Sequence, residues 1–220
     1  MCSLTRLDCR VDTGWLKGHH ELGTVAEALS HILKEAVSLA QLRLTFREFA
    51  ASDDAGTHTY FDYNFRPQVP RQEILHEFVQ VSRRLLLCPD PGLRHLRRLH
   101  LSLNTGAPHL IHLLDRLPNL RHLRLDYVAL LPGGGRWDNV LEWISQHLRL
   151  DTIELQALED ISGAQPRLLF FSNAPVWKAD DVNIDSYCEY ERAIVRYALR
   201  QSSSLPLLSP DDFLQQRLCI

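Results

Sequence analysis

The stretch that decides the fold runs from Leu117 to Leu125 and reads Leu-Pro-Asn-Leu-Arg-His-Leu-Arg-Leu. Its last six residues follow the pattern leucine-x-x-leucine-x-leucine, where x is any residue. Related copies stand at residues 4–9, 39–44, 96–101 and 150–155, with cysteine at position 9 and isoleucine at position 153 as replacements. Because successive side chains of a β-strand point to opposite faces, the alternating leucines of each copy predict a short strand with one apolar face.

This strand pattern is typical of a leucine-rich repeat, a unit that buries its apolar face only by stacking on its neighbours. Segments with a helical apolar period separate the strands and cover residues 24–36, 70–85, 108–117 and 137–148. A capping box formed by Thr24 and Glu27 predicts that the first helix begins near residue 24, and Pro108 suits the first turn of the third. The aromatic stretch at 59–65 predicts an additional strand.

Alternating strands and helices predict an α/β leucine-rich-repeat solenoid of about five irregular repeats, with parallel strands and with helices on the convex side. Residues 1–160 are expected to form the repeats. Residues 161–220 are expected to form a C-terminal cap with a helix around 186–200, where Ser186 and Glu189 make a second capping box. The first strand lies close to Met1, so we expect either a further segment or another chain to cover that end of the core.

Three phrases resemble the repeat region of fungal F-box proteins with degenerate leucine-rich repeats. They are the stretch 117–125 quoted above, the helix-to-strand stretch 137–144 with 148–151, and the helical stretch 190–199. The resemblance implies that the repeats recruit a protein for modification by a cullin-type ubiquitin ligase. In that family an F-box holds a Skp-type adaptor. No F-box sequence precedes Leu4, so this chain is not expected to hold the adaptor itself.

Composition narrows the classes of function. The formal net charge is −3, whereas dedicated nucleic-acid-binding domains are usually strongly basic. The five cysteines are dispersed without close pairs, which favours reduced thiols and therefore the cytoplasm or the nucleus. Charged residues interrupt the first twenty positions, and no apolar stretch approaches the ~20 residues of a membrane span, so neither a signal peptide nor a membrane partner is expected.

No motif in the sequence indicates an enzyme, a cofactor site or a metal site. The stretch Gly133-Gly134-Gly135-Arg136 lacks the lysine and hydroxyl residue that complete a phosphate-binding loop, and it is interpreted as a turn before a helix. His109, His112 and Asp115 have helical spacing, but a zinc site needs three or four converging ligands. The sequence contains neither the motif His-Glu-x-x-His nor a pair of closely spaced cysteines. We therefore expect a non-enzymatic protein without cofactor or metal.

Alternate positions of the predicted strands face away from the leucines and form three rows across the sheet. The first row is Arg6, Gln41, Arg98, His122 and Thr152, the second is Asp8, Arg43, His100, Arg124 and Glu154, and the third is Arg10, Thr45, Ser102, Asp126 and Gln156. The candidate partner-binding residues are Arg43, Arg98, His100, His122, Arg124, Asp126 and Glu154. The three arginines among these candidates are expected to make the main contacts to an acidic or phosphorylated segment of a protein partner.

The sequence therefore favours a protein–protein interaction module that recruits its partner on the concave face. Two alternatives stay open. The same basic strip suits an RNA or a phosphorylated ligand, for which strong salt dependence of binding is the distinguishing property. Polar residues at these positions are also what a solvated strand surface carries without any binding role.

Overall fold

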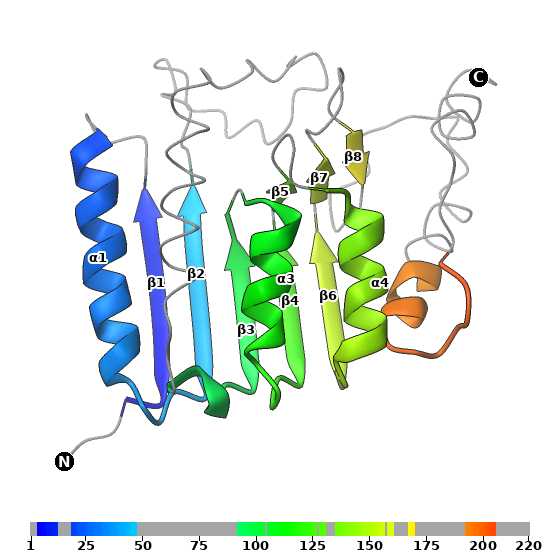
Figure 1. Cartoon of the computed structure of the whole chain (residues 1–220), viewed down its shortest axis with the longest axis horizontal. Coiled ribbons are helices and arrows are strands. Elements are labelled where there is room, and N and C mark those ends of the chain that lie inside the picture. The colour runs from blue at the N-terminus through cyan, green and yellow to red at the C-terminus, as the bar shows by residue number, and fades with distance from the viewer. Residues whose placement is uncertain are drawn as a thin grey trace, which may run out of the picture.

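The parallel sheet predicted from the sequence is present. The computed structural model describes residues 4–12, 19–47, 92–103, 105–126, 128–130, 135–156, 158–160, 167–169 and 192–205. Five parallel strands form one sheet in the order β1-β2-β3-β4-β6 (Figure 1). Their bounds are Arg6–Asp12 for β1, Gln41–Arg47 for β2, Arg98–Ser102 for β3, His122–Asp126 for β4 and Thr152–Gln156 for β6. Each of the five copies of the leucine pattern is therefore a strand, and sequence order is sheet order.

The leucine pattern also sets the register of the sheet. Equivalent positions of the motif lie side by side in every pair of neighbouring strands, so Leu7, Leu42, Leu99, Leu123 and Ile153 form one continuous line. A slip of one residue would turn the leucines toward the opposite face, because side chains alternate with a period of two. The apolar face therefore fixes the register of the polar one.

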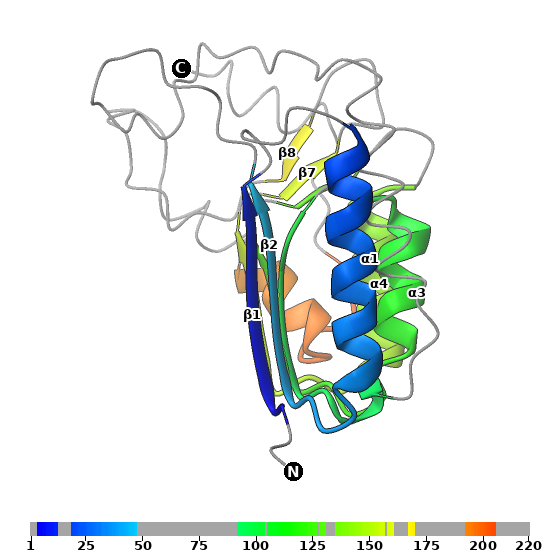
Figure 2. The same ribbon diagram turned by 90° about the vertical axis from the view of Figure 1, so that its left-hand side faces the viewer.

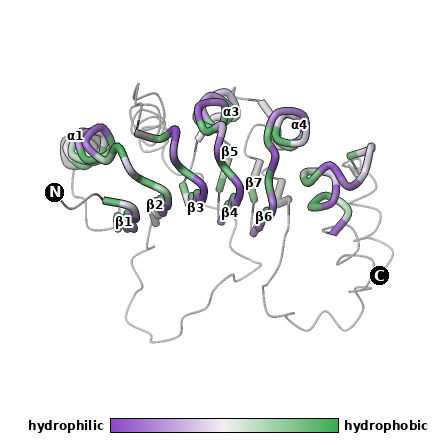
Figure 3. The backbone as a smooth tube through the Cα atoms, turned by 90° about the horizontal axis from the view of Figure 1, so that it is seen from below, coloured by the Kyte–Doolittle hydropathy of each residue, from purple (hydrophilic) through white to green (hydrophobic). Residues whose placement is uncertain are grey.

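Helices α1 (His19–Glu35), α3 (Ala107–Asp115) and α4 (Trp137–His147) lie on one side of the sheet (Figures 2 and 3). A short 3₁₀ helix, η2 (Gly92–His95), precedes β3. The helices expected at 108–117 and 137–148 are confirmed, and Pro108 lies in the first turn of α3 as predicted. The strand expected at 59–65 and the helix expected at 70–85 lie outside the described residues.

The predicted start of the first helix is wrong. The helix α1 begins at His19, so Thr24 lies inside it and does not act as its N-cap. The helix also contains Gly23, but a glycine inside a helix costs only about 1 kcal/mol relative to alanine. The packing of the apolar face of the helix, where Leu29 and Leu33 are buried, offsets a cost of that size.

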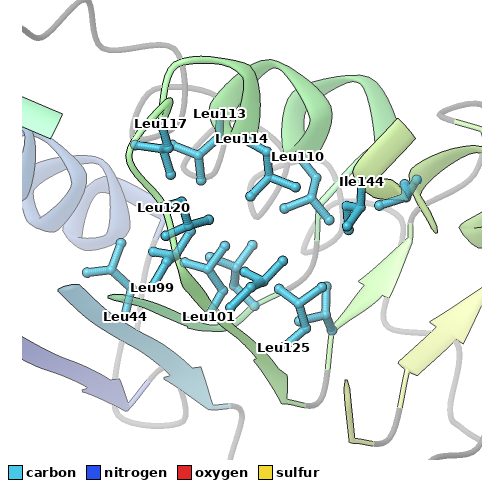
Figure 4. Packing of buried hydrophobic residues seen from close by; sticks show 14 of the residues in the cluster. Leu44, Leu99, Leu101, Leu110, Leu113, Leu114, Leu117, Leu120, Leu125 and Ile144 are labelled. Atoms are coloured by element: carbon cyan, nitrogen blue, oxygen red, sulfur yellow. The ribbon is translucent and has the colours of Figure 1, made fainter. Parts of the chain in front are cut away.

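One apolar core joins the helices to the sheet. Leucines of β3 and β4 face leucines of α3, and Ile144 of α4 continues the same layer (Figure 4). Leu101, Leu110 and Leu125 have no exposed surface. Burying one leucine side chain contributes about 1.5–3 kcal/mol, so this layer makes a large contribution to the stability of the described region.

A smaller sheet follows the large one. It contains β5 (Ala129–Leu130), β7 (Leu158–Asp160) and β8 (Arg167–Leu169), with β5 parallel and β8 antiparallel to β7. Within the segment expected to be the C-terminal cap, residues 192–198 are helical and lie beside α4, at the end of the sheet opposite to β1 (Figure 1). Ile194 and Ala198 of this segment are buried in the common core.

None of the described helices has both the length and the apolar character needed to cross a membrane.

Candidate functional site

The three predicted rows of outward-facing residues lie in register across the sheet. Arg98 is aligned with Gln41 on one side and with His122 on the other, and His100 is aligned in the same way with Arg43 and Arg124. We call this surface, on the side of the sheet turned away from α1, α3 and α4, the polar face. The five strands thus present three ladders of polar side chains on a backbone that the core holds in place.

Burial differs sharply between the rows. The first row contains the exposed residues Arg6 and Arg98, in agreement with the prediction. The third row is instead buried at its centre, where Thr45, Ser102 and Asp126 are only 3%, 2% and 5% exposed. A buried carboxylate is costly unless charged or hydrogen-bonding groups compensate it, so Asp126 needs partners within the sheet.

Arg124 and His100 provide those partners. The guanidinium of Arg124 donates to Asp126 Oδ2 from Nε at 3.0 Å and from Nη2 at 2.9 Å. Its third nitrogen, Nη1, donates to Glu154 Oε2 on the next strand at 3.0 Å. His100 Nε2 lies 3.2 Å from the same Oδ2 atom of Asp126. The four side chains form a network across β3, β4 and β6 that fixes the orientation of Arg124.

Two opposing effects act on the carboxyl group of Asp126. Burial raises its pKa, whereas the close contact with His100 and the hydrogen bonds and charge of Arg124 lower it. The second effect is larger, so the pKa of Asp126 lies below its ordinary value. Asp126 is therefore ionised at neutral pH.

The arginines expected to contact a partner do not have equal freedom. Arg43 lies 3.7 Å from Asp8 on the neighbouring strand, and Arg124 is engaged by Asp126 and Glu154. The Arg98 guanidinium makes no hydrogen bond or ion pair with another of the described residues. Of the three, Arg98 is therefore the one whose charge is not already neutralised by a described neighbour.

His122, another candidate, is half-buried in the first row beside Arg98. Its Nδ1 atom lies 2.9 Å from the Thr152 hydroxyl oxygen, a hydrogen bond between neighbouring strands. The first row carries no acidic side chain, in contrast to the second and third. The basic character of the polar face is therefore concentrated where the strands begin.

Additional arginines lie at this edge of the sheet, which we call the entry edge because its parallel strands begin there. Arg97 and Arg121 directly precede β3 and β4, and Arg94 and Arg149 lie in the segments that lead into β3 and β6. All four are exposed. Arg121 Nη1 donates to the carbonyl oxygen of Arg149 at 3.0 Å, which holds the loops before β4 and β6 together.

The sequence reasoning missed these arginines because it considered only alternate positions inside the strands. A signal was nevertheless present. Arg97 and Arg121 occupy the same position of the repeated pattern, directly before an outward-facing Arg98 or His122. Stacked repeats place equivalent positions next to one another, so two basic residues at one motif position predict neighbouring charges.

The arrangement provides charges and hydrogen-bond donors on one face of the sheet. In the described part of the chain, no three histidine, cysteine, aspartate or glutamate side chains are grouped as metal ligands would be.

Comparison with protein families, curated proteins and solved structures finds no match to this chain.

Proposed function

We propose that the protein is a leucine-rich-repeat solenoid that acts as a non-enzymatic protein-interaction module and binds its partner on the polar face. The observation that carries this proposal is the in-register alignment of polar side chains over five neighbouring strands, on a surface whose reverse side forms the core. A surface held rigidly in this way loses little conformational entropy on binding.

The charges of the surface favour an acidic or phosphorylated segment as the bound part of the partner. Arg98 belongs to the first row, next to the entry edge, and Arg97 and Arg121 lie beside it at that edge. Guanidinium groups form paired hydrogen bonds with carboxylates and phosphates, which gives such a contact both strength and orientation. Arg124 is held by Asp126 and Glu154, so its contribution to partner binding is mainly a fixed surface shape and hydrogen bonds.

The test is fluorescence anisotropy with labelled peptides. A peptide rich in aspartate and glutamate, and the same peptide with phosphoserines, are compared with a lysine-rich peptide of equal length. We expect the anionic peptides to bind and Arg98→Glu to weaken binding by about tenfold or more, because an attraction becomes a repulsion. Lys34→Glu, which makes the same change of charge on the exposed side of α1, is the matched control.

The competing function is RNA binding by the same basic residues. A single-stranded RNA oligonucleotide is therefore included as a probe and titrated at several salt concentrations. Tighter binding of the RNA than of any peptide, with affinity falling steeply as salt rises, would replace the protein-binding proposal by the nucleic-acid one. No binding of any anionic probe would refute the basic surface as the binding site.

The resemblance to F-box proteins adds a proposal about the biological context, namely that the bound partner is a protein recruited to a cullin-type ubiquitin ligase. A partner identified by affinity capture should then carry ubiquitin in cells in an amount that depends on this protein. Unchanged ubiquitination after removal of the protein would refute this role and leave the interaction module itself unaffected.

A further inference from the structure

The first strand of the sheet has an unpaired edge in the described part of the chain. β1 is the terminal strand and pairs with β2 alone. The carbonyl oxygen of Thr5 accepts hydrogen bonds from the Ala40 and Gln41 amides at 2.9 and 3.1 Å, so odd-numbered residues direct their backbone groups toward β2. By alternation, the backbone groups of residues 6, 8, 10 and 12 point to the opposite edge. A seven-residue edge strand without proline is a template for pairing with another strand.

The apolar core is also incompletely covered at this end. Leu7, Cys9 and Val11 of β1 are half-buried, whereas the equivalent residues of β2, Leu42, Leu44 and Phe46, are buried. The large apolar residues with exposed side chains among the described residues are Leu4, Ile32 and Val37, at 43%, 42% and 59%. Ile32 lies in α1, Leu4 lies just before β1 and Val37 just after α1, and these two elements lie together at one end of the molecule (Figure 1).

The charged side chains along β1 are complementary to those of a second copy of the same strand. On the polar face the strand carries Arg6, Asp8 and Arg10, and position 12 is an aspartate. This alternating series is complementary to itself when read in the opposite direction. In an antiparallel pair centred on Cys9, each Asp8 stands opposite Arg10 of the other copy, and each Arg6 stands opposite position 12.

The same charges select a single register. A shift of two residues in either direction places Asp8 opposite Asp8 or Arg10 opposite Arg10, and like charges directly opposite each other are destabilising. A shift of one residue is excluded because it would bring leucines to the polar face. Among the described residues, the carboxylate of Asp8 lies 3.8 Å from Arg10 and 3.7 Å from Arg43, which is longer than a charge-assisted hydrogen bond, so it can form a closer pair with Arg10 of a second copy.

We propose that two copies of the chain associate through β1, antiparallel, about a twofold axis that passes beside Cys9. The pairing joins both sheets into one and places the two copies of α1 on the same side of the joined sheet. An interface of this kind is isologous, which means that each copy contributes the same surface. The proposal is independent of the partner-binding function proposed above.

A pair of charge-reversal variants tests the proposal. Asp8→Arg places two arginines opposite each other at both cross-strand positions, and Arg10→Asp places two aspartates there. Each variant alone should dimerise about tenfold or more weakly than the wild type, as measured by sedimentation equilibrium. Mixed in equal amounts, the two variants should form a heterodimer, because both positions again pair a cation with a carboxylate. Arg98→Glu on β3 is the control and should leave dimerisation unchanged.

The position of Cys9 gives a second, independent readout. Residues at the centre of this register form a pair without backbone hydrogen bonds, with Cα atoms about 4.5 Å apart, within the range of a disulfide. Oxidation of the full-length protein with copper phenanthroline should therefore give a covalent dimer that Cys9→Ser abolishes. A wild-type protein that stays monomeric at high concentration, or folded single variants that dimerise as well as the wild type, would overturn the proposal, as would variants that stay monomeric after mixing.

Discussion

Replacement of Asp126 by asparagine tests whether a buried carboxylate anchors the polar face. The Asp126 side chain is 7% exposed and accepts two hydrogen bonds from Arg124, whose side chain is 44% exposed. Hydrogen bonds to charged groups contribute about 1.5–3 kcal/mol in proteins. Because the freed guanidinium regains contact with water, we expect Asp126→Asn to lower the free energy of unfolding by about 1–2 kcal/mol.

Glu154 provides a matched control within the same network. Its carboxylate lies as close to Arg124, at 3.0 Å, but its side chain is 64% exposed. Exposed ion pairs are screened by solvent and contribute little, so Glu154→Gln should cost about 0.5 kcal/mol or less. The two variants remove the same chemical group from the same arginine and differ mainly in burial.

The assay is urea unfolding followed by tryptophan fluorescence and by far-ultraviolet circular dichroism. Because the pKa of Asp126 is lowered in the folded state, its contribution is present above the unfolded-state pKa of about 3.9 and is lost as pH falls through the folded-state value. The difference between the wild type and Asp126→Asn should therefore shrink once the pH falls below about 4. An equal or larger cost for Glu154→Gln, or a difference that grows in acid, would refute this reasoning.

Three further outcomes follow from the structure. Leu125→Ala, at a fully buried position of the central layer, should lower the free energy of unfolding measured by urea denaturation by about 2–5 kcal/mol. Ile32→Ala, at an exposed position, should lower it by about 1 kcal/mol or less in the monomer. Gly135→Ala should cost about 1–2 kcal/mol in the same assay, because Gly135 has φ of 90° and an added Cβ would lie 3.2 Å from Cβ of Ala107. Burial, assisted by the charge of Asp8, raises the pKa of the Cys9 thiol. Alkylation of Cys9 by iodoacetamide at neutral pH should therefore be slower than alkylation of the amino acid cysteine in solution, and it should accelerate as pH rises. Rapid alkylation of Cys9 at neutral pH would contradict this.

Much of the fold could be predicted because the leucine pattern is local and repeated. Its period of two defines each strand, and the helical period between copies defines α3 and α4. Equivalent motif positions, such as Leu99 and Leu123, pair in register because only that register brings all the leucines to one side. Boundaries were predicted less well, as the start of α1 shows, because the cost of a glycine within a helix is small compared with the gain from packing.

The candidate site was predicted in its placement but not in its energetics. The sequence alone determined that Arg98, His100, Arg124 and Asp126 lie on one face, since strand alternation requires it. Only the tertiary structure decided which of their charges are already paired, because the pairs of Arg124 with Glu154 and of His100 with Asp126 join residues of different strands. Burial of Asp126 and exposure of Arg98 likewise depend on neighbours distant in the chain, and no local pattern encodes those distances.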